Sequence, residues 1–362
     1  MTTIAQDPGL VIGGVDTHKD THVAAALDGL GRLLGTASFP TTRNGYRRLL
    51  TWLQSHGDIA AVGVEGCGSW GAGLARHLET RGVEVIEVNR PNRQDRRRRG
   101  KSDTIDAEQA ARAVLAGTAT ATPKSGTGPV EAIRQLRVAR AGAMKARTAA
   151  ANQIHSLCDT APDSIRSQLR GLSIPKRVAV AERWRPGTGA TPETAAKRAI
   201  ASVARRWRAL DDEARALQAH LKKILDELAP ALLAVHAVGY DTASQLLITA
   251  GDNPERLGNE RSFAALCGVA PVPASSGRTN GRYRLNRGGD RHANSALWRI
   301  VIVRMATHQP TKDYVARRTA QGMPRLEIIR CLKRYVARQL YPAITAVAAE
   351  HLTPPAPVAT AA

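Results

Sequence analysis

The sequence predicts an α/β domain at the N-terminus, a helical, coiled-coil-like middle region and a mainly α-helical C-terminal domain. Three observations lead to this prediction. Apolar, β-like runs alternate with helical patterns near the N-terminus, and two long, rather polar helical patterns follow. A helix, a Gly-containing turn and a second helix then begin the C-terminal part. With 362 residues, of which 43% are hydrophobic, the chain can bury the cores of two or three domains.

The first elements form a predicted antiparallel meander. Residues 10–28 contain a strand, a turn and a strand, and a third strand follows over 31–40. A helix fits 43–56, because its apolar residues fall on one side.

The meander is followed by alternating strands and helices. Residues 59–65 predict a fourth strand, 70–81 a helix and 83–89 a fifth strand, and another helical pattern begins at Asp103. Such alternation after a meander indicates a single α/β domain.

Two breaks divide the rest of the chain. The Thr-, Gly- and Pro-rich segment 117–129 predicts a linker or loop, and RPGTGATP at 185–192 is a second break. Helical patterns at 130–172 and 193–229 lie around the second break and predict an antiparallel hairpin or coiled-coil arm. The predicted domains are residues 10–128 for the α/β domain, 129–230 for the helical region, 231–350 for the C-terminal domain and 351–362 for a disordered tail.

The charge of the chain limits the classes of partner that it is suited to bind. Lys and Arg number 52 against 31 Asp and Glu, which gives a net charge of +21 and favours nucleic acid or an anionic membrane as a partner. No apolar run approaches the roughly 20 residues of a membrane span, and the N-terminus does not resemble a signal peptide. We therefore expect a cytoplasmic protein. Its four cysteines lack the spacing of a zinc site or a disulfide framework.

Four carboxylates predict a metal site. Asp16 and Glu65 lie at or near the ends of apolar, strand-like runs, and Asp103 and Asp106 begin a helical pattern three residues apart, on one helix face. Mg²⁺ prefers such oxygen ligands and stabilises the attacking and leaving oxygens in phosphoryl transfer. The ordinary alternatives are a turn residue after a strand for Asp16, a side chain that accepts backbone amides for Glu65, and an N-cap with a capping box for the other two.

Basic residues stand directly before the last two acids. The run RPNRQDRRRRGKSD at 90–103 contains six Arg and one Lys, and it is either a solvated loop or a phosphate-binding arm. We favour the arm, with Arg93, Arg96, Arg97, Arg98, Arg99 and Lys101 as nucleic-acid ligands. His18 and His22 are four residues apart, but their segment alternates like a strand turn. We expect a hydrogen-bonding or solvent role for both.

A serine segment is the second candidate for chemistry. Ser275 and Ser276 precede Gly277, and five arginines follow that could stabilise charge on a phosphate: Arg278, Arg282, Arg284, Arg287 and Arg291. The spacing alone favours an ordinary Ser- and Gly-containing loop on a basic surface, because no catalytic triad pattern accompanies the serines.

These segments together resemble the DEDD transposases of bacterial insertion sequences, the insertion-sequence one-ten family, also described as bridge-RNA-guided serine recombinases. VDTHKDTHVAAALD, VEGCGSWG and NRPNRQDRRRRGKSDTIDAEQAARA are similar to the family's RuvC-like (RNase H-like) domain. LLAVHAVGYDTASQLLITAGD is similar to the helix-hairpin-helix-like entry to its C-terminal domain, although it lacks the Pro-Gly often seen there. FAALCGVAPVPASSGRTNGRYRLNRGGDRHANSAL resembles the signature of the serine transposase domain.

The resemblance implies a reaction. The four acids would bind Mg²⁺ or Mn²⁺, and a serine would attack the scissile phosphate to form a phosphoserine–DNA intermediate. Its position before Gly277 gives that role to Ser276, with Ser275 as the alternative.

The resemblance also implies partners. They are donor and target DNA, a structured noncoding guide RNA, and further copies of the chain in a dimer or tetramer joined through 129–230, with no membrane. The protein would be associated with the nucleoid when it acts, and subunits would share active sites.

Three other functions fit parts of the pattern. A RuvC-like nuclease or junction resolvase would use the acids with water as the nucleophile. A sugar or acetate kinase of the related actin-like fold would explain GGVDTH, but the arginine run and the net charge of +21 argue against it. A non-catalytic nucleic-acid-binding protein is the third.

Overall fold

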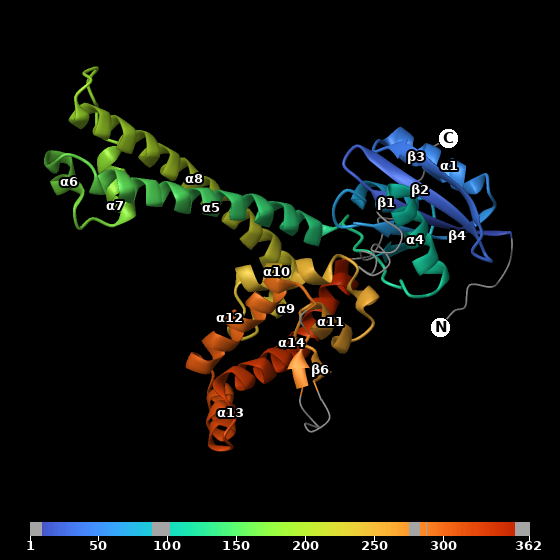
Figure 1. Ribbon diagram of the computed structural model, residues 1–362. Coiled ribbons are helices and arrows are strands. Elements are labelled where there is room, and N and C mark those ends of the chain that lie inside the picture. The colour runs from blue at the N-terminus through green and yellow to red at the C-terminus, as the bar shows by residue number, and fades with distance from the viewer. Residues whose placement is uncertain (1–8, 89–101, 275–282, 287, 352–362) are drawn as a thin grey trace, which may run out of the picture. The chain divides into compact units, whose positions relative to one another are not determined.

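The chain forms two compact units (Figure 1). A computed structural model describes residues 9–88, 102–274, 283–286 and 288–351, with side chains to residue 347. Unit 1 comprises Met1–Gly128 and Ala250–Gly258, and unit 2 comprises Pro129–Thr249 and Asn259–Ala362. All but the first residue of the predicted tail, 351–362, lies outside the described residues. The predicted domain boundaries stay a prediction.

Unit 1 is built on a five-stranded sheet with the order β3-β2-β1-β4-β5. The strands β1 (Leu10–Thr17), β2 (Thr21–Asp28) and β3 (Leu33–Pro40) pair antiparallel, which confirms the predicted meander. The strands β4 (Asp58–Glu65) and β5 (Val85–Val88) extend the sheet in parallel with β1. The result is the mixed α/β sheet that an RNase H-like fold requires.

Helices cover both faces of this sheet. The helices α1 (Arg43–Gln54) and α2 (Ala72–Glu79) pack on one face, and α4 (Asp103–Leu115) packs on the other. Along β1, Val11 and Val15 belong to the core beneath α1 and α2, whereas Ile12 belongs to the core beneath α4. Successive side chains of β1 thus point to opposite faces of the sheet, as expected of a strand that is buried on both faces.

A segment from far along the sequence completes unit 1. The side chain of Asn253 donates to the backbone oxygen of Pro123 at 2.9 Å and accepts from the backbone N–H of Ser125 at 3.1 Å. Its neighbourhood, Ala250–Gly258, includes the short 3₁₀ helix η1 (Pro254–Leu257). The predicted linker at 117–129 is therefore anchored near its end by an asparagine that follows it by more than a hundred residues.

Unit 2 contains the predicted helical hairpin. The helices α5 (Pro129–Asp159) and α8 (Pro192–Leu228) pack along each other, and Figure 1 shows them in green and yellow-green. Arg147 pairs with Asp211, while the later Gln153 pairs with the earlier Arg206. Partners therefore run in opposite order, so the helices are antiparallel.

The first helix of the hairpin is shorter than predicted. The helical pattern at 130–172 is broken near Pro162, and two short helices follow, α6 (Asp163–Leu169) and α7 (Ile174–Ala181). Proline disfavours helical backbone at the residue before it, so the chain turns at this point. The turn lets α6 and α7 pack apolar side chains against the end of the hairpin.

The rest of unit 2 is mainly helical, as predicted. Its elements are α9 (Pro230–Leu233), α10 (Tyr240–Ala250), α11 (Glu260–Leu266), β6 (Pro271–Pro273), β7 (Tyr283–Leu285), α12 (Arg291–Thr307), α13 (Gln309–Ala320) and α14 (Arg325–His351). In the turn before α10, Ala237 has a positive φ of 67°, a conformation that favours glycine. Within the described ranges, no helix combines the length and the apolar character that a membrane crossing needs.

Candidate metal and nucleic-acid site

Two of the predicted acids come directly after residues that pair with each other on parallel strands. Val15 of β1 pairs with Val64 of β4, and Asp16 and Glu65 are the next residues on each strand. Both valines belong to the core beneath α1 and α2. Because side chains alternate along a strand, Asp16 and Glu65 point to the opposite face, which α4 covers.

Glycines on this face let α4 lie unusually close to the sheet. A Cβ on Gly14 would lie 2.2 Å from the backbone oxygen of Ala107 and 2.3 Å from the backbone nitrogen of Ala111. A Cβ on Gly63 would lie 2.9 Å from the backbone oxygen of Ala110. Such distances exclude any larger residue without a shift of the helix, so the two glycines fix where α4 begins relative to the strand ends.

The close packing brings a first cluster of potential ligands together. One carboxylate oxygen each of Asp16 and Asp103 and one ring nitrogen of His18 lie within 4.8 Å of one another. His18 Nδ1 is 3.7 Å from Asp16 Oδ2. Asp16 is buried, His18 is half-buried and Asp103 is exposed, so the cluster opens to solvent through the start of α4.

The other two acids flank this cluster but do not belong to it. Asp106 is only 3% exposed, one helical turn after Asp103. Glu65 is half-buried, and its backbone oxygen accepts a 2.7 Å hydrogen bond from Thr17 Oγ1 that ties the two strand ends together. The structure therefore brings Asp16 and Asp103 together and leaves Glu65 and Asp106 outside the 4.8 Å group.

The start of α4 shows that the alternative interpretation of its acids, an N-cap at Asp103 with a capping box, is wrong. Ser102, not Asp103, is the N-cap, and its side chain accepts from the backbone N–H of Ile105. Asp103 is the first helical residue, and Asp106 lies one position beyond the capping-box position. The partial positive charge of the helix start also stabilises both carboxylates.

The two histidines lie in different environments. His18 is a member of the acidic cluster, and its distance of two residues from Asp16 is the strand spacing that could have indicated this. His22 is completely buried and stacks on Tyr46, with ring centroids 5.6 Å apart. Burial lowers the pKa of this ring, whereas the backbone of Thr21, against which the ring lies, raises the pKa. The solvent role predicted for His22 is therefore wrong, because the side chain is fully buried.

The predicted nucleophile and most of the predicted phosphate ligands lie outside the described residues. They are Arg93, Arg96, Arg97, Arg98, Arg99, Lys101, Ser275, Ser276, Arg278, Arg282 and Arg287. The remaining two, Arg284 on β7 and Arg291, are exposed. Arg291 is the first residue of α12, where the helix dipole disfavours a cation. An anionic partner would offset this unfavourable position.

A polar network fixes the chain after the serine segment. Asp290 caps α12 through the backbone N–H groups of His292 and Ala293, and it accepts from Thr249 Oγ1 at 2.7 Å and Gln245 Nε2 at 3.3 Å. Burial alone would raise the pKa of Asp290. The hydrogen bonds from Thr249 and the α12 amides outweigh burial, so the pKa is lowered.

A second part of the network holds the chain before the serine segment. Asn294 donates to the backbone oxygens of Cys267 and Gly268, and it accepts from Lys333 Nζ at 2.9 Å. Lys333 is 8% exposed, and burial, assisted by the nearby Arg330, lowers its pKa. The strands β6 and β7, on either side of 275–282, pair antiparallel.

Known proteins match both parts of the chain. A family model for DEDD transposases of the IS110 type, described as a transposase, matches residues 13–161. A second, described as the transposase IS116/IS110/IS902 family, matches residues 229–316. Together the two matches cover more than half of the chain.

A curated relative extends the comparison. The insertion element IS110 uncharacterized 43.6 kDa protein of Streptomyces coelicolor is 28% identical over 151 residues, which are 41% of this chain. The match spans only 36% of that relative. With the two family models on both parts of the sequence, the chain belongs to the IS110 family of transposases.

Proposed function

We propose that this chain is the transposase of an insertion sequence and that it cleaves and rejoins DNA strands. The observation that carries the proposal is the acidic cluster at the strand ends, which lies inside the first family match. A strongly basic chain that brings the buried Asp16 and the exposed Asp103 together is suited to act on a polyanion.

The residues at the strand ends fit a divalent cation. Asp16 and Asp103 offer carboxylate oxygens within 4.8 Å of each other, and His18 adds a nitrogen that suits Mn²⁺ better than Mg²⁺. In our proposal Glu65 and Asp106 complete the ligand set of Asp16 and Asp103. The bound Mg²⁺ or Mn²⁺ would neutralise charge on the scissile phosphate and its leaving oxygen.

The proposed nucleophile is Ser276, with Ser275 as the alternative. Its hydroxyl oxygen would form a bond to phosphorus while the phosphorus–oxygen bond to the neighbouring nucleotide breaks. The departing oxygen would leave as a hydroxyl after it receives the proton that the serine loses. The resulting phosphoserine conserves the energy of the broken bond, so rejoining needs no further cofactor.

The proposed partners follow from the same family. They are donor and target DNA, a structured noncoding guide RNA that selects both, and further copies of the chain in a dimer or tetramer. Because a guide RNA would select the sequence by base pairing, the protein would need to recognise only the nucleic-acid backbone and its shape. The exposed Arg284 and Arg291 are suited to that task, because cations on a surface bind phosphates without regard to sequence.

The experiment that tests the proposal uses the full-length chain with any RNA that co-purifies. DNA that spans an element end is incubated with Mg²⁺, and both cleaved strands and covalent protein–DNA adducts are measured. We expect Ser276→Ala to lose the adduct and Asp106→Asn to lower cleavage by at least about a hundredfold. Asp212→Asn, an exposed position on α8, is the matched control and should cleave normally.

Two results would contradict parts of the proposal. Cleavage without any adduct in Ser276→Ala and Ser275→Ala would favour the RuvC-like nuclease or junction resolvase, with water as the nucleophile. Normal cleavage by Asp106→Asn would remove that residue from the metal site. Thermal unfolding of each variant shows whether a loss of activity is a loss of fold.

A further inference from the structure

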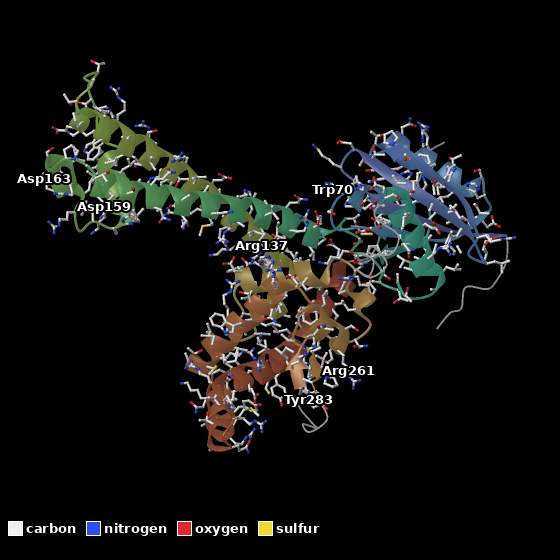
Figure 2. All side chains as sticks on the ribbon, in the orientation of Figure 1. Trp70, Arg137, Asp159, Asp163, Arg261 and Tyr283 are labelled. Carbon is white, nitrogen blue, oxygen red and sulfur yellow. The ribbon has the colours of Figure 1, made fainter. Side chains whose placement is uncertain are left out.

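An exposed tryptophan lies beside the acidic cluster. Trp70, labelled in Figure 2, follows β4 and Glu65 in a short loop. Its relative exposure is 55%. The loop is well defined, because the backbone N–H groups of Ser69 and Gly71 both donate to the backbone oxygen of Gly66, at 2.8 and 3.1 Å. The side chain therefore projects from a fixed turn.

His18 holds the indole in place. The two rings stack with centroids 6.2 Å apart and an angle of 20° between their planes. The same imidazole lies 3.7 Å from Asp16 Oδ2. Trp70 thus stacks on His18, a member of the acidic cluster.

Trp70 offers a large aromatic surface to solvent. Large aromatic side chains contribute most when they are buried, and this chain has only five Trp and 4% aromatic residues. One face of the indole stacks on His18, and more than half of the side-chain surface stays open to solvent. A flat, open ring at this position can stack a second flat ring against it.

We propose that Trp70 stacks on the base of the DNA nucleotide next to the scissile phosphate, and that His18 supports the indole from its other side. The inference rests on the proposed function, in which a divalent cation on the carboxylates would position the phosphate. A phosphate held at that cation would have its own base within reach of a ring at the edge of the cluster. Stacking tolerates any base, because every base has a π face.

Trp70 is then a positioning residue. It would hold the nucleotide after the base leaves its neighbours in the strand, which reduces the freedom of the phosphate before cleavage. We assign DNA rather than guide RNA as the occupant, because the adjacent acids would hold the cation at the strand that is cut.

A binding experiment tests the stacking directly. The probe is a short single-stranded DNA with 2-aminopurine, whose fluorescence falls when it stacks, mixed with the full-length chain in Ca²⁺. We expect strong quenching for the native chain and for Trp70→Phe. Trp70→Ala should lose the quenching and bind about tenfold more weakly. Trp298→Ala, at 47% exposure on α12, is the matched control and should behave like the native chain.

The outcomes separate this inference from the proposed function. If the native chain cleaves DNA in Mg²⁺ and Trp70→Ala shows unchanged quenching and affinity, the stacking is wrong and the function stands. If the native chain never cleaves but Trp70→Ala loses the quenching, the stacking stands and the function fails. If an RNA probe of the same sequence showed stronger Trp70-dependent quenching than the DNA probe, the assignment of DNA as the occupant would be overturned.

Discussion

The acidic cluster of unit 1 and the chain on either side of the serine segment in unit 2 are held in place by different forces. Behind the acids are apolar strands and a helix that touches the sheet backbone through Gly14 and Gly63. On both sides of the serine segment is a network of polar side chains that includes Asp290, Asn294 and Lys333.

This difference predicts different sensitivities. A site fixed by close packing should respond to added volume, because an interior without voids cannot accept an extra methyl group. A site fixed by buried polar groups should respond to the loss of one partner, because each remaining group is left unsatisfied. Substitutions in the two units can test whether the contrast holds.

The largest effect is expected at Gly14. Gly14→Ala places a Cβ 2.2 Å from the backbone oxygen of Ala107, so α4 has to move away from β1. We expect the free energy of unfolding to fall by about 3 kcal/mol, measured by urea denaturation. Gly68→Ala is the control, because its Cβ would meet nothing within 4 Å. Equal stability of the two variants would show that packing does not position α4.

A smaller effect is expected at Asp290. Asp290→Ala removes the cap of α12 and the acceptor of Thr249 and Gln245, which should cost about 2 kcal/mol of unfolding free energy. Asp313→Ala, which removes an exposed acceptor of Gln309, should cost much less. The same urea denaturation measures both, and an equal loss would count against the network.

The pH dependence of this network has a definite sign. The pKa of Asp290 is lower in the folded chain than its ordinary value of 3.8. Its contribution is therefore complete above pH 3.8 and is lost as the pH falls from there through the lower, folded value. Asp290→Asn should weaken this acid-induced loss.

The smallest effect is expected at His22. Burial lowers the pKa of His22 below 6.5. A hydrogen bond with the backbone of Thr21 opposes this shift, and repulsion by His18 adds to it. The unfolded chain then binds the proton first, so the stability of unit 1 should decrease as the pH falls below 6.5. His22→Phe keeps a ring against Tyr46 and should reduce this slope, whereas His220→Phe at an exposed position should not. The test is urea denaturation at a series of pH values, and an unchanged slope in His22→Phe would exclude His22 as its source.

The α/β part of the fold could be predicted because its patterns are local. Alternating apolar residues define the strands, and the predicted meander and the helix from Asp103 agree with the structure. The end of α5 was missed because the helical pattern continues past Pro162, and only packing shows that the chain turns there.

The candidate site was predicted in part. Its carboxylates could be located, since acids at strand ends and at a helix start stand out in sequence. The place of His18 beside Asp16 was missed because HKDTH was judged by the separation of its two histidines. Strand geometry instead places His18 with Asp16 and buries His22 against Tyr46. The contact of Gly14 with α4 depends on residues nearly a hundred positions away, which no local pattern contains.

The Ala250–Gly258 segment has a consequence for how the protein is made. The chain leaves unit 1 after Gly128, returns at Ala250 and leaves again after Gly258. All four acids therefore emerge from the ribosome well before Asn253, the residue that anchors the backbone at Pro123 and Ser125. A nascent chain that stops before Ala250 would carry every proposed metal ligand in an incompletely folded unit. Unit 1 would thus be completed only after the long helices have been synthesised. The acidic site would then be finished when much of the serine-bearing unit already exists.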